Sequence, residues 1–143
     1  MKFAAHFTRE DDGWVVEIPE AGGGGIATQG DTLEEAREMA RDAVTEVLLA
    51  QLDQDQALSN GPNKLPKGLG WEWVLPYQTA WTAIQVLQAR KSKGLTIAQA
   101  AELCGVSGPT YVRWEDPYKG NATVKTLEKV ATALGKHLEV VLH

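Results

Sequence analysis

Small, polar and basic residues that suit contact with a nucleic acid are concentrated in the C-terminal half of the sequence. The candidates are Thr96, Ser107, Gly108, Pro109, Thr110, Arg113, Lys119, Asn121 and Lys125. Arg113 can donate two hydrogen bonds to a guanine edge, and Thr110 can contact a thymine methyl group. The last three candidates suit phosphate oxygens, which position a protein on DNA without reading its sequence.

Two short helices joined by a glycine turn would hold these side chains. The run Thr96-Ile97-Ala98-Gln99 has the pattern of a capping box, and Gly105 permits a left-handed turn after the first helix. Ser107 can cap the second helix with Pro109 in its first turn, and Ala101 lets the two helices approach closely. This pattern predicts a helix-turn-helix, whose second helix enters a major groove of DNA. A plain helical bundle without a DNA partner is the alternative.

Acidic side chains form a second cluster near the N-terminus, consisting of Glu10, Asp11, Asp12, Glu17 and Glu20. Carboxylates hold metal ions for nuclease chemistry only when several converge from different elements. The aspartates are expected in a hairpin turn and Glu17 on one strand face, so convergence is not expected. We therefore expect no catalytic residue, no metal and no cofactor. The acids are interpreted as a patch for a basic partner, with a merely solubilising role as the alternative.

The net charge of −5 conceals a difference between the two halves of the chain. Residues 1–76 carry six basic and fourteen acidic side chains, a balance of −8, whereas residues 77–143 carry eight and five, a balance of +3. The asymmetry predicts two domains, residues 1–76 and 77–143, with different partners. The acidic domain repels RNA but suits a basic protein surface, and the basic domain suits DNA.

The first domain has the pattern of a small antiparallel sheet with one packed helix. Residues 2–8, 14–18 and 26–29 resemble short strands, and a tight Asp-Gly turn separates the first two. A capped amphipathic helix is expected from Asp31 or Thr32 to about Leu52, followed by a loop and a strand over residues 71–75. The predicted fold class is therefore α+β.

The second domain is expected to be helical, with a strand at its end. A helix from Thr79 and another with an apolar stripe from Val124 to Leu134 flank the two short helices. Leu138, Val140 and Leu142 then alternate with other residues, which is typical of a strand. Because an unpaired strand exposes backbone groups, we expect it to pair with a second copy of the chain in a homodimer or higher oligomer.

Composition also bears on the cellular compartment. No apolar run is long enough to span a bilayer, and the first residues lack an uninterrupted apolar leader. The single cysteine, Cys104, cannot form an internal disulfide. We expect a cytoplasmic protein without membrane contact.

The C-terminal half resembles the helix-turn-helix of the lambda-repressor-like (Xre) family over about residues 80–135. The resemblance rests on Leu95-Thr96, Ala101, Gly105-Val106-Ser107, Trp114-Glu115, Leu127 and Ala133-Leu134-Gly135. That family often has Gln where Ile97 stands, and polar residues where Gly108 and Pro109 stand. The resemblance implies DNA binding with few base-reading side chains, so a dimer on paired half-sites is expected.

The N-terminal half resembles the HicB antitoxin family over about residues 1–76. The matching residues are Phe7, Glu10-Asp11-Asp12-Gly13-Trp14-Val15-Val16, Ile18-Pro19-Glu20, Gly25 and the run from Thr28 to Ala36. One departure is the run from Ala21 to Gly25, where the family usually has a proline and a Gly-Cys pair. The resemblance implies a partial ribonuclease-H-like fold.

The same resemblance implies a partner and a function. HicB antitoxins bind and block a HicA-type toxin, a small basic ribonuclease that degrades messenger RNA, and members often carry a C-terminal DNA-binding domain. The acidic cluster would then face the toxin, and the second domain would bind operator DNA and repress the chain's own operon. The alternative function is a ligand-responsive helix-turn-helix transcription regulator without a toxin partner.

Overall fold

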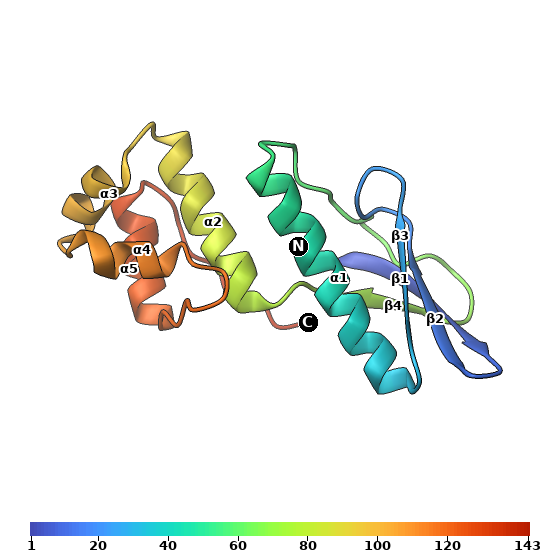
Figure 1. Cartoon of the computed structure of the whole chain (residues 1–143). Coiled ribbons are helices and arrows are strands. Elements are labelled where there is room, and N and C mark those ends of the chain that lie inside the picture. The colour runs from blue at the N-terminus through green and yellow to red at the C-terminus, as the bar shows by residue number, and fades with distance from the viewer. The chain divides into compact units, whose positions relative to one another are not determined.

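The computed structural model describes residues 1–143 and contains four strands and five helices (Figure 1). The chain divides into two compact units, Met1–Gln78 and Thr79–His143. The first unit combines a sheet with a helix, whereas the second contains helices and no strand. The α+β class predicted from the sequence is confirmed.

The N-terminal unit is built on an antiparallel sheet with the strand order β3-β2-β1-β4. Its strands are β1 (Phe3–Glu10), β2 (Gly13–Ile18), β3 (Ile26–Gly30) and β4 (Trp71–Val74). Asp11 and Asp12 form the turn between β1 and β2, as the sequence predicts. A Cβ atom on Gly13, whose φ is +150°, would lie 2.5 Å from the carbonyl oxygen of Gly30, so this position requires glycine.

Helix α1 (Leu33–Asp53) covers one face of the sheet (Figure 1). It begins at a predicted cap, because the Thr32 hydroxyl oxygen accepts a hydrogen bond from the Glu35 N–H at 3.1 Å. The Glu35 carboxylate in turn accepts one from the Asp31 N–H at 3.3 Å. The buried side chains of this unit include Ala36, Ala40, Val44 and Leu48 of α1 and Phe3, Phe7, Val16 and Ile18 of the sheet.

The segment that follows β4 is fixed to α1. Pro76 is fully buried, and the Tyr77 N–H donates to the Thr45 hydroxyl oxygen at 3.0 Å. The Tyr77 hydroxyl donates to the Glu38 carboxylate, and the Arg41 guanidinium lies 4.5 Å from the centre of the tyrosine ring. The hydrogen bond to Glu38, with burial as a lesser cause, raises the pKa of Tyr77. The chain is therefore held to α1 as far as Tyr77.

The C-terminal unit consists of α2 (Gln78–Ser92), α3 (Ile97–Cys104), α4 (Gly108–Trp114) and α5 (Val124–Ala133). One apolar core joins these helices, formed by Val86, Ala100, Ala101, Cys104, Tyr111, Val130 and Leu134. Helix α5 ends at the predicted stop, since Gly135 adopts a φ of +72°. The expected set of four helices is confirmed.

The predicted terminal strand is wrong for the isolated chain. Residues 134–143 contain no strand, although Leu138, Val140 and Leu142 have the expected alternation. A strand requires hydrogen bonds from a neighbouring strand, and the only sheet of this chain is the one formed by β1 to β4. These three side chains are instead exposed, by 37%, 61% and 94% respectively.

Candidate functional site

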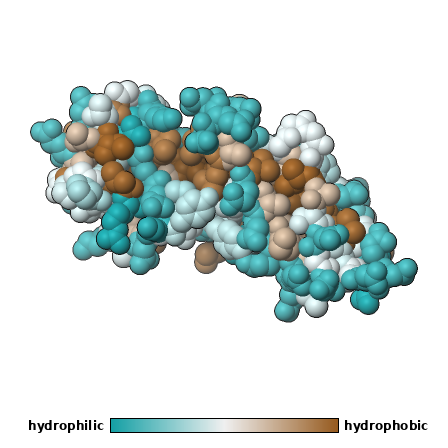
Figure 2. All heavy atoms as spheres, viewed as in Figure 1, coloured by the Kyte–Doolittle hydropathy of each residue, from teal (hydrophilic) through white to brown (hydrophobic).

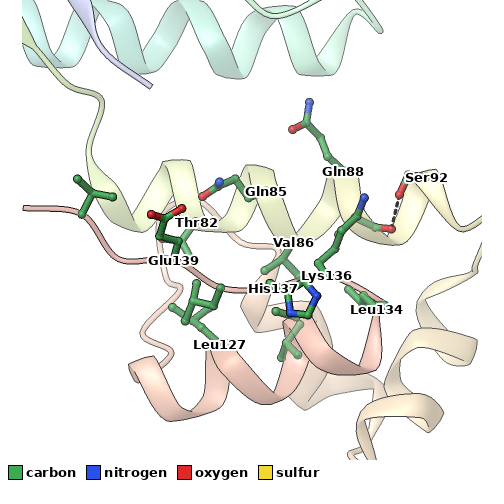
Figure 3. A pocket seen from close by; sticks show the side chains of 15 residues that line it. Thr82, Gln85, Val86, Gln88, Ser92, Leu127, Leu134, Lys136, His137 and Glu139 are labelled. Carbon is green, nitrogen blue, oxygen red and sulfur yellow. Dashed lines mark hydrogen bonds between the residues drawn. The ribbon is translucent and has the colours of Figure 1, made fainter.

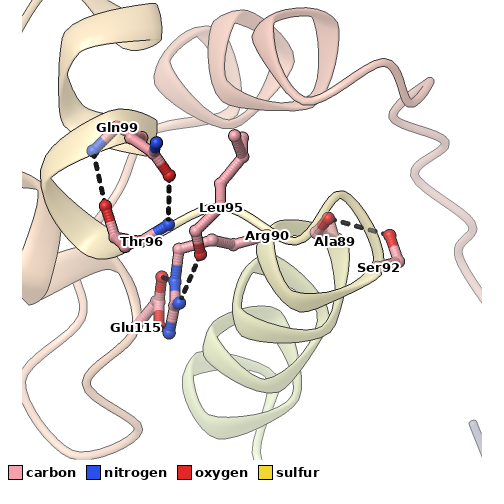
Figure 4. A network of polar contacts seen from close by, with 7 residues as sticks. All are labelled: Ala89, Arg90, Ser92, Leu95, Thr96, Gln99 and Glu115. Carbon is pink, nitrogen blue, oxygen red and sulfur yellow. Dashed lines mark hydrogen bonds and ion pairs between the residues drawn. The ribbon is translucent and has the colours of Figure 1, made fainter.

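The first helix of the candidate DNA-binding motif begins at a complete capping box. The Thr96 hydroxyl oxygen accepts from the Gln99 N–H at 3.1 Å, and the Gln99 side-chain oxygen accepts from the Thr96 N–H at 2.8 Å (Figure 4). At the other end of α3, Gly105 has a φ of +69°. The Val106 N–H then donates to the Ala101 carbonyl at 3.0 Å, which closes the turn. The predicted boundaries of this helix are therefore confirmed.

Helix α4 is held by its apolar side. The Ser107 hydroxyl oxygen accepts from the Thr110 N–H at 3.3 Å, and Pro109 occupies the first turn. Tyr111 is fully buried, and the centre of its ring lies 5.7 Å from that of Trp114 in an edge-on contact. Burial of this side turns the opposite side of α4 to solvent.

The exposed side of α4 presents most of the predicted base-reading residues. Pro109, Thr110 and Arg113 are exposed, whereas Gly108 is half-buried. Val112 is also exposed, by 46%, and is not among the residues predicted from the sequence to contact DNA. Its position next to the buried Tyr111 was the available signal, since neighbours along a helix point in different directions. An exposed aliphatic side chain here suits a thymine methyl group.

A buried ion pair ties α4 to the rest of the unit. The Arg90 guanidinium donates two hydrogen bonds to the Glu115 carboxylate, at 2.7 and 3.0 Å, and a third to the Leu95 carbonyl at 2.9 Å (Figure 4). Only 14% of the Arg90 side chain and 8% of the Glu115 side chain are exposed. The hydrogen bonds with Glu115 raise the pKa of Arg90. The pair therefore links the end of α2, the start of α3 and the end of α4.

The candidate phosphate contacts lie beyond α4. The Asp116 carboxylate accepts from the backbone N–H groups of Tyr118 and Lys119, at 2.8 and 3.0 Å, which orders the loop. Lys119, Asn121 and Lys125 are all exposed, the last in the first turn of α5. The loop and the start of α5 thus present two cationic groups to solvent.

A groove of about 610 Å³ lies in the helical unit between α2, α5 and the C-terminal segment (Figure 3). Apolar side chains that line it include Val86, Leu127, Val130, Leu134, Leu138 and Val141. Polar lining residues include Gln85, Gln88, His137 and Glu139. Hydrophobic residues interrupt the hydrophilic surface on the face shown in Figure 2.

The five acidic candidates of the N-terminal unit are all exposed. Glu10 ends β1, Asp11 and Asp12 form the hairpin turn, Glu17 lies in β2, and Glu20 follows that strand. They do not converge, and the structure contains no group of three or more His, Cys, Asp or Glu side chains placed to hold a metal. The acids form a band along the β1–β2 hairpin.

Comparison with known proteins identifies both units. A helix-turn-helix family model matches residues 86–141. The chain is 30% identical to Antitoxin HicB 2 of Photorhabdus laumondii, over 99% of this chain and 96% of that protein. The chain belongs to the HicB antitoxin family. Antitoxin HicB 1 of the same organism is 32% identical to this HicB chain, over 90% of the chain and 78% of that relative.

Family membership confirms the resemblance inferred from the sequence. The helix-turn-helix match covers α3, α4 and α5 of this HicB antitoxin, together with part of α2. No helix of the chain is long and apolar enough to span a membrane. The DNA-contacting, toxin-contacting and dimer-forming residues stay predictions.

Proposed function

We propose that this HicB antitoxin binds and covers a HicA-type ribonuclease toxin through its N-terminal unit and represses its own operon through its C-terminal unit. The single observation that carries the proposal is the helix-turn-helix, with α4 exposed, in a chain that matches curated antitoxins over almost its whole length. The proposed role is steric and electrostatic, and the chain catalyses no reaction.

DNA binding is assigned to the exposed side of α4 and the loop that follows it. Arg113 would read a guanine, and Thr110 and Val112 would contact thymine methyl groups. Thr96, Ser107, Gly108 and Pro109 supply backbone and hydroxyl groups at the starts of the two helices. Lys119, Asn121 and Lys125 would contact phosphates and make the affinity dependent on salt.

Toxin binding is assigned to the acidic N-terminal unit. Residues 1–76 have a charge balance of −8, which favours association with a basic ribonuclease. Glu10, Asp11, Asp12, Glu17 and Glu20 are exposed along one hairpin and offer carboxylates to Lys and Arg side chains of a partner. A toxin held there would be sterically separated from RNA.

Dimer formation is assigned to the C-terminal segment. Leu138, Val140 and Leu142 are exposed and carry unpaired backbone groups, which a second copy of the segment can satisfy as an antiparallel strand. Two helix-turn-helix units joined in this way would contact paired half-sites. Because one α4 offers few base-reading side chains, the dimer would supply most of the operator affinity.

Co-purification with the product of the adjacent toxin gene tests the proposal. The full chain is expected to copurify with that protein, to stop its cleavage of RNA, and to bind a DNA fragment from its own promoter. A chain that binds promoter DNA but no protein from the neighbouring gene would overturn the antitoxin role. Such a chain would fit a ligand-responsive regulator instead.

A further inference from the structure

One face of the N-terminal sheet carries no helix. Because side chains alternate along a strand, the buried Phe3 and Phe7 face α1, and His6 lies on the opposite face. Antiparallel partners share a face, so Glu17 and Trp71, which both pair with His6, lie there too. We define the open sheet face as His6, Val15, Glu17, Leu69, Trp71 and Trp73.

An ion pair independently identifies the covered face. Glu72 pairs with the buried Ala5, and its carboxylate accepts two hydrogen bonds from the Arg37 guanidinium of α1, at 2.7 and 3.2 Å. The side chains of Trp71 and Trp73 therefore point away from α1, because they flank Glu72 in the strand. Both tryptophans are only half-buried.

The aromatic residues of the open sheet face are held in place. The rings of His6 and Trp71 lie 4.9 Å apart between their centres, tilted by 50°. The Lys2 ammonium lies 4.2 Å from the centre of a Trp73 ring. Side chains that are rigid before binding lose little entropy in a complex, and tryptophan is enriched among residues that dominate interface energies.

An exposed leucine extends this apolar surface. Leu69 is 95% exposed, yet its backbone is fixed, because its carbonyl oxygen lies 3.1 Å from His6 Nε2. The next carbonyl, that of Gly70, accepts from the Phe7 N–H at 2.8 Å. The structure thus holds a large apolar side chain in solvent in the turn that leads into β4, next to the His6 edge of the open sheet face, where a partner could cover it.

Charge indicates which partner would cover this face. Glu17 of β2 and Trp71 of β4 both pair with His6 of β1 and therefore lie on either side of it. The acidic hairpin turn lies at the end of β1 and β2. Two of the acids on α1 are already engaged within the unit, since Glu38 accepts from the Tyr77 hydroxyl and Glu35 from the Asp31 N–H. Lys2 also lies on this side of the sheet, over the Trp73 ring. Trp71 and Glu17 on this face, with the acidic turn at the end of the hairpin, fit a basic protein.

We propose that the open sheet face is the docking surface for the HicA-type toxin, with Trp71 and Leu69 as apolar anchors and Glu17 as a charged contact. The proposal rests on the proposed antitoxin function and specifies where the toxin binds. It places the toxin on the side of the sheet opposite α1.

The test compares full-length variants in which exposed residues are changed on opposite sides of the unit. Leu69→Asp and Glu17→Lys alter the open sheet face, and Met39→Asp and Glu46→Lys make the same charge changes on exposed positions of α1. Titration calorimetry with the catalytically inactive toxin measures affinity. Each open-face variant is expected to weaken toxin binding by at least about tenfold, as loss of an interface anchor does. The α1 variants are expected to stay within about threefold, as surface substitutions outside an interface do.

Each other result has a definite meaning. Unchanged toxin affinity in both open-face variants, or a loss confined to the α1 variants, would overturn the docking surface while leaving the antitoxin role intact. Open-face variants that dissociate copies of the chain, with toxin affinity unchanged, would show that the face joins two chains instead and would also overturn it. A wild-type chain that fails to bind the toxin would overturn the proposed function itself. Operator affinity, measured in parallel, is expected to be the same for all four variants.

Discussion

Arg90 and Glu115 form a bidentate ion pair that joins the last turn of α2 to the residue that caps α4. The same guanidinium donates to the carbonyl of Leu95, just before α3 begins. One arginine therefore positions both helices of the DNA-binding motif.

Removal of one member of this pair should destabilise the C-terminal unit. Glu115→Ala leaves a largely buried guanidinium without its carboxylate, and breaking such a pair costs about 3 to 5 kcal/mol. The matched control is Glu72→Ala, which breaks the exposed pair with Arg37, and such surface pairs contribute about 1 kcal/mol or less. Urea unfolding of the full chain measures both. Equal losses for the two variants would contradict the positioning role of Arg90.

Replacement of Arg113 should separate base reading from phosphate contact. Arg113→Ala is expected to lower operator affinity by about 1 to 3 kcal/mol and to relax specificity at one base pair. Lys119→Ala should instead weaken binding to all sequences. It should also reduce the slope of log affinity against log salt concentration by about one. Fluorescence anisotropy over a range of salt concentrations distinguishes the two effects. If Arg113→Ala changes neither the affinity nor its salt dependence, α4 is not the recognition helix.

Acid should loosen the loop after α4. The backbone N–H groups of Tyr118 and Lys119 hold the pKa of Asp116 below its ordinary value of 3.8. A carboxyl whose pKa is lower in the folded state stabilises the fold above the pKa of the unfolded state. This contribution disappears as pH falls through the folded value. Asp116→Ala should therefore reduce the free energy of unfolding at neutral pH and flatten its dependence between about pH 5 and pH 2. Urea unfolding at each pH measures this free energy. If it falls with acid as steeply in the variant as in the wild type, this account is contradicted.

Close packing at the start of α1 should make Gly30 intolerant of a side chain. A Cβ atom there would lie 2.4 Å from the Ala36 backbone nitrogen. Gly30→Ala is expected to cost about 1 to 3 kcal/mol, as overpacking does. Gly24→Ala is the control, because a Cβ on Gly24 meets no atom within 4 Å. Thermal unfolding compares the two, and a harmless Gly30→Ala would show that α1 can move away from β3.

Local signals in the sequence predicted much of this fold. The caps at Thr32, Thr96 and Ser107 each need only a hydroxyl residue and the three or four residues after it, so the pattern identifies them. The left-handed glycines at the ends of α3 and α5 are equally local. Most of the exposed residues of α4 could also be predicted, because the cap at Ser107 and the helical period indicate which positions face solvent.

Relationships between distant residues could not be predicted in this way. Arg90 and Glu115 are 25 positions apart, and no local pattern indicates their pairing. The exposure of Val112 depends on which residues of α4 pack into the core of the unit. The C-terminal segment shows the opposite error. Its alternation predicts a strand, whereas in the isolated chain it pairs with none of the four strands of the sheet.

The most direct test of the antitoxin role is the rate at which the cognate toxin cleaves RNA as increasing amounts of the full chain are added. We expect cleavage to fall to background once the chain is in small excess over the toxin. The Arg113→Ala variant should inhibit equally well, because we assign the toxin and the operator to different units. Cleavage that continues unchanged at a saturating concentration of the chain would contradict the proposed function.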